Sequence, residues 1–194
     1  MYIYDFDNTI YEGDTSRDIL IFSLKKHPIL VLRSLKEAKK LEKEYKAGKV
    51  EFERVKEALF SFLFKIENLD DYLNGFVEKH FKNIKSFYIH QMRDEDLVIS
   101  ASYEIWITKF CKKLGIRYVI ATKTNKDGYI EGKNCKGVEK LKRLATTIPN
   151  ARVLESYSDS ATDIPVLEVA FKPFVVEGER VIPYVKGYNF KNKD

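Results

Sequence analysis

The segment MYIYDFDNTI, residues 1–10, decides how the rest of the chain is interpreted. Its first half is rich in aromatic and β-branched residues, the types that favour a buried strand. Two carboxylates, Asp5 and Asp7, follow where this strand ends. Residues two apart on an extended chain point to the same side, so like charges there raise each other's pKa unless a cation or hydrogen bonds stabilise them. The pair therefore indicates a catalytic site that binds a divalent cation, with an ordinary Asp-Asn turn as the alternative.

The composition is typical of a globular protein. Of 194 residues, 44% are hydrophobic and 32% are charged, which suits one core with or without an insertion. The net charge of +5 comes from lysines mixed with glutamates and not from a basic stripe, so no nucleic-acid partner is expected. Cys111 and Cys135 fit neither a disulfide framework nor a zinc pattern. Without a signal peptide or a long apolar run, we expect a cytoplasmic protein with no stable membrane insertion.

Residues 14–91 predict a helical block inserted after the first strand. Apolar residues recur there at three- and four-residue steps in four successive segments. Gly48 is expected to end the second helix, and Asn68 to act as N-cap of the fourth. We expect residues 1–13 and 92–194 to form a core domain and residues 14–91 to form a cap domain.

After this block, short apolar runs alternate with helical segments, which predicts an α/β fold with a parallel sheet. Ser100 and Asp159 each follow one of these runs, as Asp5 follows the first strand. Ligands of such sheets bind beyond the carboxyl ends of the strands, so we expect these three residues at one edge. The expected strands comprise residues 97–99, 118–120 and 174–176 and one that begins at residues 153–154 and ends at Ser158. The expected helices lie at about residues 103–114 and 137–147 and after Asp163.

Four stretches in this order resemble the motifs of the haloacid dehalogenase superfamily of phosphohydrolases. Asp5-Phe6-Asp7-Asn8-Thr9 looks like its Asp-x-Asp-x-Thr signature. Ser100 ends an apolar strand, a lysine opens a later helix, and Asp159-x-x-x-Asp163 resembles the last motif. The resemblance implies a Rossmann-like core with an inserted helical cap. The place of the insertion is similar to the phosphoserine phosphatase branch. Residues 100–102, 135–140 and 157–160 look closer to small bacterial phosphatases that include a phosphatidylglycerophosphate phosphatase.

The resemblance assigns the central chemistry to two aspartates. Asp5 would be the nucleophile that forms an aspartyl-phosphate. Asp7 would first be the general acid that protonates the leaving alcohol and then the base that activates water. Mg²⁺ would be held by the Asp5 side chain, the Asp7 carbonyl and the Asp159 side chain.

Other residues would support this chemistry. Ser100 would donate to a phosphate oxygen, and Thr9 would brace the loop. Lys140 and Lys136 are rival candidates for the lysine that neutralises phosphate charge, and we favour Lys140. Asp163 would orient that lysine or a metal-bound water, unless it only caps the next helix.

The cap is expected to act as a lid that excludes water. Asp14 lies where phosphoserine phosphatases carry a glutamate that meets the substrate amine, although capping a helix is an equal alternative. Arg17 is a candidate for contact with a substrate anion. Ser102 is expected to be a helix N-cap and not a ligand.

We therefore expect a Mg²⁺-dependent phosphomonoester phosphatase that acts on a small phosphorylated metabolite or lipid head group. A phosphomutase or phosphotransferase with the same intermediate is one alternative. A catalytically dead module that binds phosphorylated ligands is another. Such a module should have lost Asp5, Asp7 or the distal acidic pair, all of which are present.

Overall fold

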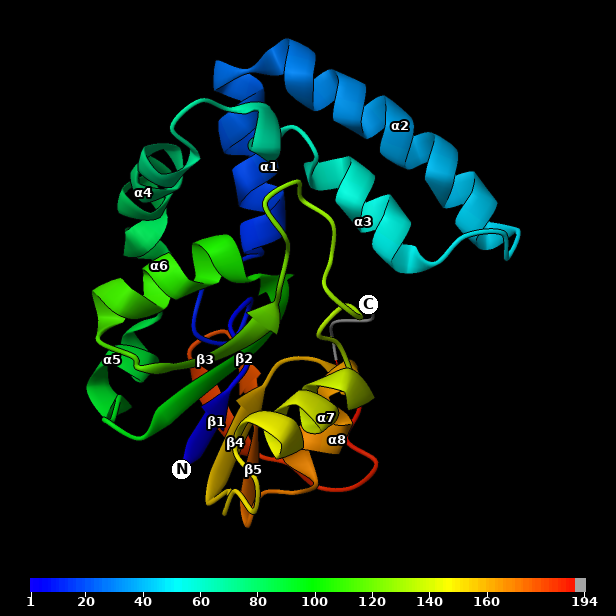
Figure 1. Cartoon of the computed structure of the whole chain (residues 1–194). Coiled ribbons are helices and arrows are strands. Elements are labelled where there is room, and N and C mark those ends of the chain that lie inside the picture. The colour runs from blue at the N-terminus through cyan, green and yellow to red at the C-terminus, as the bar shows by residue number, and fades with distance from the viewer. Residues whose placement is uncertain (191–194) are drawn as a thin grey trace.

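The computed structural model describes residues 1–190 and is built around a six-stranded sheet (Figure 1). The strand order is β3-β2-β1-β4-β5-β6, and every pairing is parallel except that of β6 with β5. This arrangement confirms the expected α/β class. The strands are β1 (Tyr2–Tyr4), β2 (Asp96–Tyr103), β3 (Tyr118–Thr122), β4 (Glu155–Ser158), β5 (Lys172–Glu177) and β6 (Arg180–Pro183).

Helices cover both faces of the sheet, because successive side chains of the central strands point to opposite faces. Ile3 of β1 packs with Leu144 of α7 (Val138–Thr147), on the face that also carries α8 (Ile164–Leu167). Tyr4, the next residue, packs in the cluster on the other face, with α6 (Glu104–Leu114) and α5 (Ser86–Gln91). Figure 1 shows the two pairs of helices on opposite sides of the sheet. The central strands are therefore apolar on both faces.

Four helices between β1 and β2 stand beyond the carboxyl ends of the strands, and we call them the cap (Figure 1). Gly48 takes a left-handed φ of 67° just after the second helix, as its predicted terminating role requires. Asn68 is the N-cap residue of the fourth helix, as predicted, but its side chain makes no capping hydrogen bond. Its φ of 52° turns the chain into the helix instead. The cap helices are α1 (Thr15–Lys26), α2 (Pro28–Lys46), α3 (Phe52–Phe60) and α4 (Leu69–His80).

The cap shares one hydrophobic cluster with the rest of the molecule. Phe60 of α3 packs on Trp106 of α6 with ring centroids 5.4 Å apart, and Phe76 of α4 packs on Phe110 at 5.8 Å. Tyr88 of α5 packs on Tyr4 at 5.0 Å, so α5, which lies within the residues expected to form the cap domain, packs against the sheet. The domain limits proposed from the sequence remain a proposal. None of the helices in residues 1–190 is long and apolar enough to cross a membrane.

Candidate active site

The loop after β1 places two carboxylates at the edge of the sheet. The backbone N–H of Asp5 donates to Tyr157 of β4 at 2.9 Å, so Asp5 still follows the sheet. Asn8 then takes a left-handed φ of 54°, which asparagine tolerates better than most residues. The chain folds back, and Oδ1 of Asp7 accepts from the backbone N–H of Thr15 at 2.6 Å. Asp5 is thus held by the sheet and Asp7 by the start of α1.

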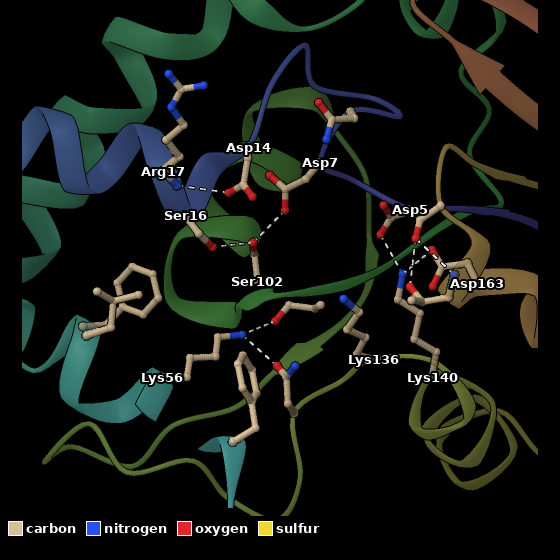
Figure 2. Close-up of a pocket in the computed structure, with 18 of the residues that line it drawn as sticks. Asp5, Asp7, Asp14, Ser16, Arg17, Lys56, Ser102, Lys136, Lys140 and Asp163 are labelled. Carbon is tan, nitrogen blue, oxygen red and sulfur yellow. Dashed lines mark hydrogen bonds and ion pairs between the residues drawn. The ribbon is translucent and has the colours of Figure 1, made fainter. Parts of the chain in front are cut away.

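Lys140 lies between the first and the last of the predicted motifs. Its Nζ is 2.7 Å from Oδ1 of Asp5 and 2.7 Å from Oδ2 of Asp163 (Figure 2). The first turn of α7 carries it, and only 2% of it is exposed. The rival Lys136 is exposed and lines the same pocket. The structure therefore brings Lys140, and not Lys136, into contact with both Asp5 and Asp163.

Acidic groups outnumber cations around Asp5. Burial raises the pKa of Asp5 well above its ordinary value, and Asp163 and Asp159 raise it further against the opposing effect of Lys140. Burial alone would lower the pKa of Lys140, but Asp163 and Asp5 raise it above its ordinary value. The shift of Lys140 follows from its two carboxylate partners, whereas that of Asp5 follows mainly from burial, which its one ammonium partner does not offset. A further cation at this point would lower the pKa of Asp5.

Asp7 occupies a separate environment in the same pocket. Its Oδ2 accepts from the Ser102 hydroxyl at 2.6 Å. Burial raises the pKa of Asp7 to about 6, and Asp14 adds to the shift, while the hydrogen bonds from Ser102 and Thr15 oppose it. A carboxyl group with this pKa exchanges a proton near neutral pH, as a general acid must.

Ser102 is not the helix cap that the sequence predicted. Strand β2 continues to Tyr103, with a register shift against β3 between Ile99 and Tyr103, and α6 starts only at Glu104. The extended chain therefore turns the Ser102 side chain toward Asp7. Ser100 is fully buried, and its hydroxyl accepts from the backbone N–H of Ser102 at 3.0 Å. On this strand, Ala101 and Ser102 line the pocket.

Thr9 joins the loop after β1 to the loop after β4. Its hydroxyl donates to Oδ1 of Asp159 at 3.2 Å and accepts from the backbone N–H of Asp159 at 3.1 Å. Thr9 is fully buried and Asp159 nearly so. The predicted bracing role of Thr9 thus corresponds to a direct contact with Asp159.

Asp14 and Arg17 lie at the outer part of the pocket. Oδ1 of Asp14 accepts from the backbone N–H of Arg17 at 3.0 Å, so Asp14 is the N-cap of α1 as well as a lining residue. Figure 2 shows the Arg17 guanidinium pointing away from Asp5 and Asp7. Contact of either residue with a substrate remains a prediction.

The pocket is charged on the side formed by the sheet and largely apolar on the side formed by the cap. Its volume is about 430 Å³, and the carboxylates and Lys140 line the side formed by the sheet. The cap supplies the apolar side chains Leu20, Phe52, Val55, Leu59 and Phe60. It also supplies Lys56, which sequence reasoning missed. Lys56 lies four residues from both Phe52 and Phe60, and this spacing places it on the same face of a helix as the two aromatic residues. The spacing is the sequence feature that could have predicted its position.

The donor set near Asp5 fits Mg²⁺. Asp5, Asp159 and Asp163 line one end of the pocket, and the buried Oδ1 of Asp163 accepts no hydrogen bond from the described residues. Carboxylate and carbonyl oxygens are the ligands that Mg²⁺ prefers. Within residues 1–190 no three His, Cys, Asp or Glu side chains form a ready-made metal cluster. The expected ligand set is smaller, because it combines two carboxylates with the Asp7 carbonyl.

Comparisons with known proteins agree with this geometry. A histidinol-phosphatase of Neisseria meningitidis serogroup C (strain 8013) is 27% identical, over 90% of this chain and 88% of that protein. A Bordetella pertussis Tohama I protein of unknown function has the same fold, with a TM-score of 0.74 and 19% identity over 89% of this chain and 87% of that one.

A solved structure described as a phospho-aspartyl intermediate analogue of phosphoserine phosphatase aligns with a TM-score of 0.50 and 25% identity, over 89% of this chain and 83% of that one. These likenesses confirm the expected enzyme class, a hydrolase of the phosphatase type. The family model described as haloacid dehalogenase-like hydrolase matches residues 2–168, from β1 to the residue after α8. The chain therefore belongs to the haloacid dehalogenase-like hydrolase family.

Proposed function

We propose that the protein is a Mg²⁺-dependent phosphomonoester phosphatase in which Asp5 is the nucleophile and Asp7 the general acid and base. The observation that carries this proposal is the contrast between the two carboxylates in one pocket. Asp5 contacts the buried Lys140, whereas Asp7 is held by neutral donors with a pKa of about 6. The first would attack phosphorus and the second would transfer a proton.

The reaction would proceed in two displacements. A carboxylate oxygen of Asp5 attacks phosphorus, the ester P–O bond breaks, and Asp7 protonates the departing alkoxide. The aspartyl-phosphate is then hydrolysed by water, whose proton Asp7 removes. Lys140 neutralises the phosphate oxygens as charge spreads over them. When bound by Asp5, the Asp7 carbonyl and Asp159, Mg²⁺ screens the repulsion between the phosphate dianion and the nucleophile.

The remaining residues would keep this arrangement in place. Thr9 holds Asp159 through two hydrogen bonds, and Asp163 holds Lys140. Ser100, whose oxygen accepts from the Ser102 N–H, would donate its hydroxyl hydrogen to a phosphate oxygen. The cap would exclude water from the pocket during catalysis.

The relatives suggest which substrates to try first. Histidinol phosphate and phosphoserine follow from the names of the similar proteins, and both have an amine that Asp14, which lines the pocket, would meet. A pocket of about 430 Å³ suits an organic group of that size. We propose a small phosphate monoester as substrate.

The test is release of inorganic phosphate by the purified chain from p-nitrophenyl phosphate, histidinol phosphate and phosphoserine. We expect release that EDTA abolishes and added Mg²⁺ restores. Asp5→Asn should lower kcat by at least about 10³-fold, because the nucleophile is lost. Asp71→Asn makes the same chemical change at an exposed position of α4 and should be neutral. Full activity of Asp5→Asn, or release that EDTA leaves unaffected, would contradict the proposal.

A further inference from the structure

One charged residue of the pocket has no part in the proposed reaction. Lys56 of α3 is only 7% exposed, and its side chain crosses from the cap to the sheet. Its Nζ donates to the carbonyl of Ala101 at 2.6 Å and to Oδ1 of Asn134 at 2.7 Å (Figure 2). Both acceptors belong to the sheet side of the pocket.

The carbonyl that Lys56 binds lies inside the segment that holds the general acid. Ala101 stands between Ser100 and Ser102 on β2. The Ser102 N–H donates to Ser100 at 3.0 Å, and the Ser102 hydroxyl donates to Oδ2 of Asp7 at 2.6 Å. The peptide that carries the Ala101 carbonyl also carries the Ser102 N–H. Fixing this carbonyl therefore fixes the residue that orients Asp7.

We propose that Lys56 is a positioning residue, which couples the seating of the cap to the orientation of the acid Asp7 through Ala101 and Ser102. The inference rests on the proposed function, since it uses the role of Asp7 as acid. In this arrangement the hydrogen bond to Ala101 forms only while α3 lies over the sheet. The acid is then correctly oriented when the pocket is covered.

A purely structural tether is the competing explanation, and the contacts of α3 argue against it. Two other residues of α3 already join this helix to the loop after β3. Glu53 accepts from the Asn134 N–H at 2.9 Å, and Glu57 accepts from the Ile130 N–H at 2.8 Å. Phe60 adds apolar packing against Trp106. Burial lowers the pKa of Lys56 to about 8, which means that the folded state disfavours its charged form. A side chain that only joined the cap to the sheet would not need a buried charge.

The inference predicts a dependence on the leaving group. Phenyl phosphate and p-nitrophenyl phosphate are similar in size, but phenolate needs protonation as it departs far more than p-nitrophenolate does. Lys56→Met should lower kcat/KM for phenyl phosphate by about 10-fold or more and for p-nitrophenyl phosphate by less than about 3-fold. Asp7→Asn should change the ratio in the same direction and by a larger factor. Glu57→Gln, which weakens another α3 contact without involving Ala101, should leave the ratio unchanged.

Equal losses for the two esters in Lys56→Met would overturn the inference, because a tether or a substrate-binding group affects both alike. A ratio that even Asp7→Asn leaves unchanged would overturn the acid role of Asp7 itself and the inference with it. Thr122→Val provides a second variant if Lys56→Met does not fold. The Thr122 hydroxyl is the other donor to the Ala101 carbonyl, at 2.6 Å. Its removal should shift the ratio in the same direction, and an unchanged ratio would count against the inference.

Discussion

Lys140 and Lys56 are both buried lysines of one pocket, but their surroundings are opposite. Lys140, on the sheet side, contacts the carboxylates of Asp5 and Asp163, which raise its pKa above the ordinary value although burial alone would lower it. Lys56, on the cap side, donates to two neutral oxygens, and burial lowers its pKa to about 8. The comparison shows that the partners of a buried lysine decide whether its charged form is favoured over its neutral form. Lys140 balances charge, whereas Lys56 orients a peptide group.

The largest expected effect comes from removing the balancing charge. Lys140→Met leaves the buried Asp5 and Asp163 without their shared cation and removes the positive charge offered to phosphate. We expect kcat for p-nitrophenyl phosphate to fall by about 10³-fold or more. The raised pKa of Lys140 contributes stability that is fully present below the ordinary pKa of lysine, so its loss should also lower Tm at pH 7.

The rival lysine provides the matched comparison. Lys136→Met should retain kcat within about 10-fold, because an exposed side chain contributes less than a buried, charge-assisted contact. Thermal unfolding at pH 7 should separate the two variants in the same order. The reverse order of activities would assign the phosphate contact to Lys136, and the role given to Lys140 in the comparison with Lys56 would then be wrong.

A smaller effect is expected from titrating Asp7. An acid must be protonated, and burial keeps the pKa of Asp7 at about 6, so kcat/KM for phenyl phosphate should fall by about 10-fold per pH unit above that value. Mg²⁺ bound nearby would move this limb to lower pH, because a cation favours the carboxylate. The measurement is a profile of kcat/KM from pH 5 to pH 9, set at constant ionic strength.

Asp7→Asn is the control, since it should lack this descending limb while losing most activity. The limb should also be shallower for p-nitrophenyl phosphate, which needs less help in leaving. A wild-type profile that stays flat to pH 9 with phenyl phosphate would assign proton transfer to another group. It would also contradict the inference about Lys56, because Asp7 would no longer be the acid that Lys56 helps to orient.

The central carboxylates could be predicted because their positions follow from local rules. Asp5 and Asp159 end neighbouring parallel strands, and the carboxyl ends of such strands meet at one edge. The partners of Lys56 follow no such rule. Ala101 lies 45 residues away in sequence and Asn134 78 residues away, so only the packed structure shows them. Ser102 was misread because a serine before a helix usually caps it, and the register shift of β2 is a tertiary effect.

The packing of α5 could not be predicted for a similar reason. Helical periodicity predicts a helix but does not indicate which surface that helix packs against. Tyr88 of α5 packs on Tyr4 of β1, and its hydroxyl donates to Asp96 of β2 at 3.1 Å. These partners lie on two different strands, and a helical pattern in residues 86–91 contains no information about either.

The smallest expected effect is on stability, and it distinguishes Lys56 from Lys140 most clearly. A pKa lowered from 10.5 to about 8 corresponds to about 3 kcal/mol by which the folded state disfavours the ammonium form of Lys56. As the pH falls from about 10 to about 8, the unfolded chain takes up this proton first, so the folded state loses stability across that window. The penalty persists at pH 7. Methionine has a similar length without the charge.

We therefore expect Lys56→Met to have a Tm at pH 7 equal to that of the wild type or higher by about 2–4 °C, since each kcal/mol shifts Tm by about that much at this chain length. The Thr122 hydroxyl still donates to the Ala101 carbonyl in the variant, which limits the loss. The difference should disappear near pH 10. Lys133→Met, at an exposed lysine paired with Glu51, should show no such pH dependence. A Tm lowered by more than about 4 °C at pH 7 would mean that Lys56 stabilises the fold as Lys140 does, and the two lysines would then differ only in their partners.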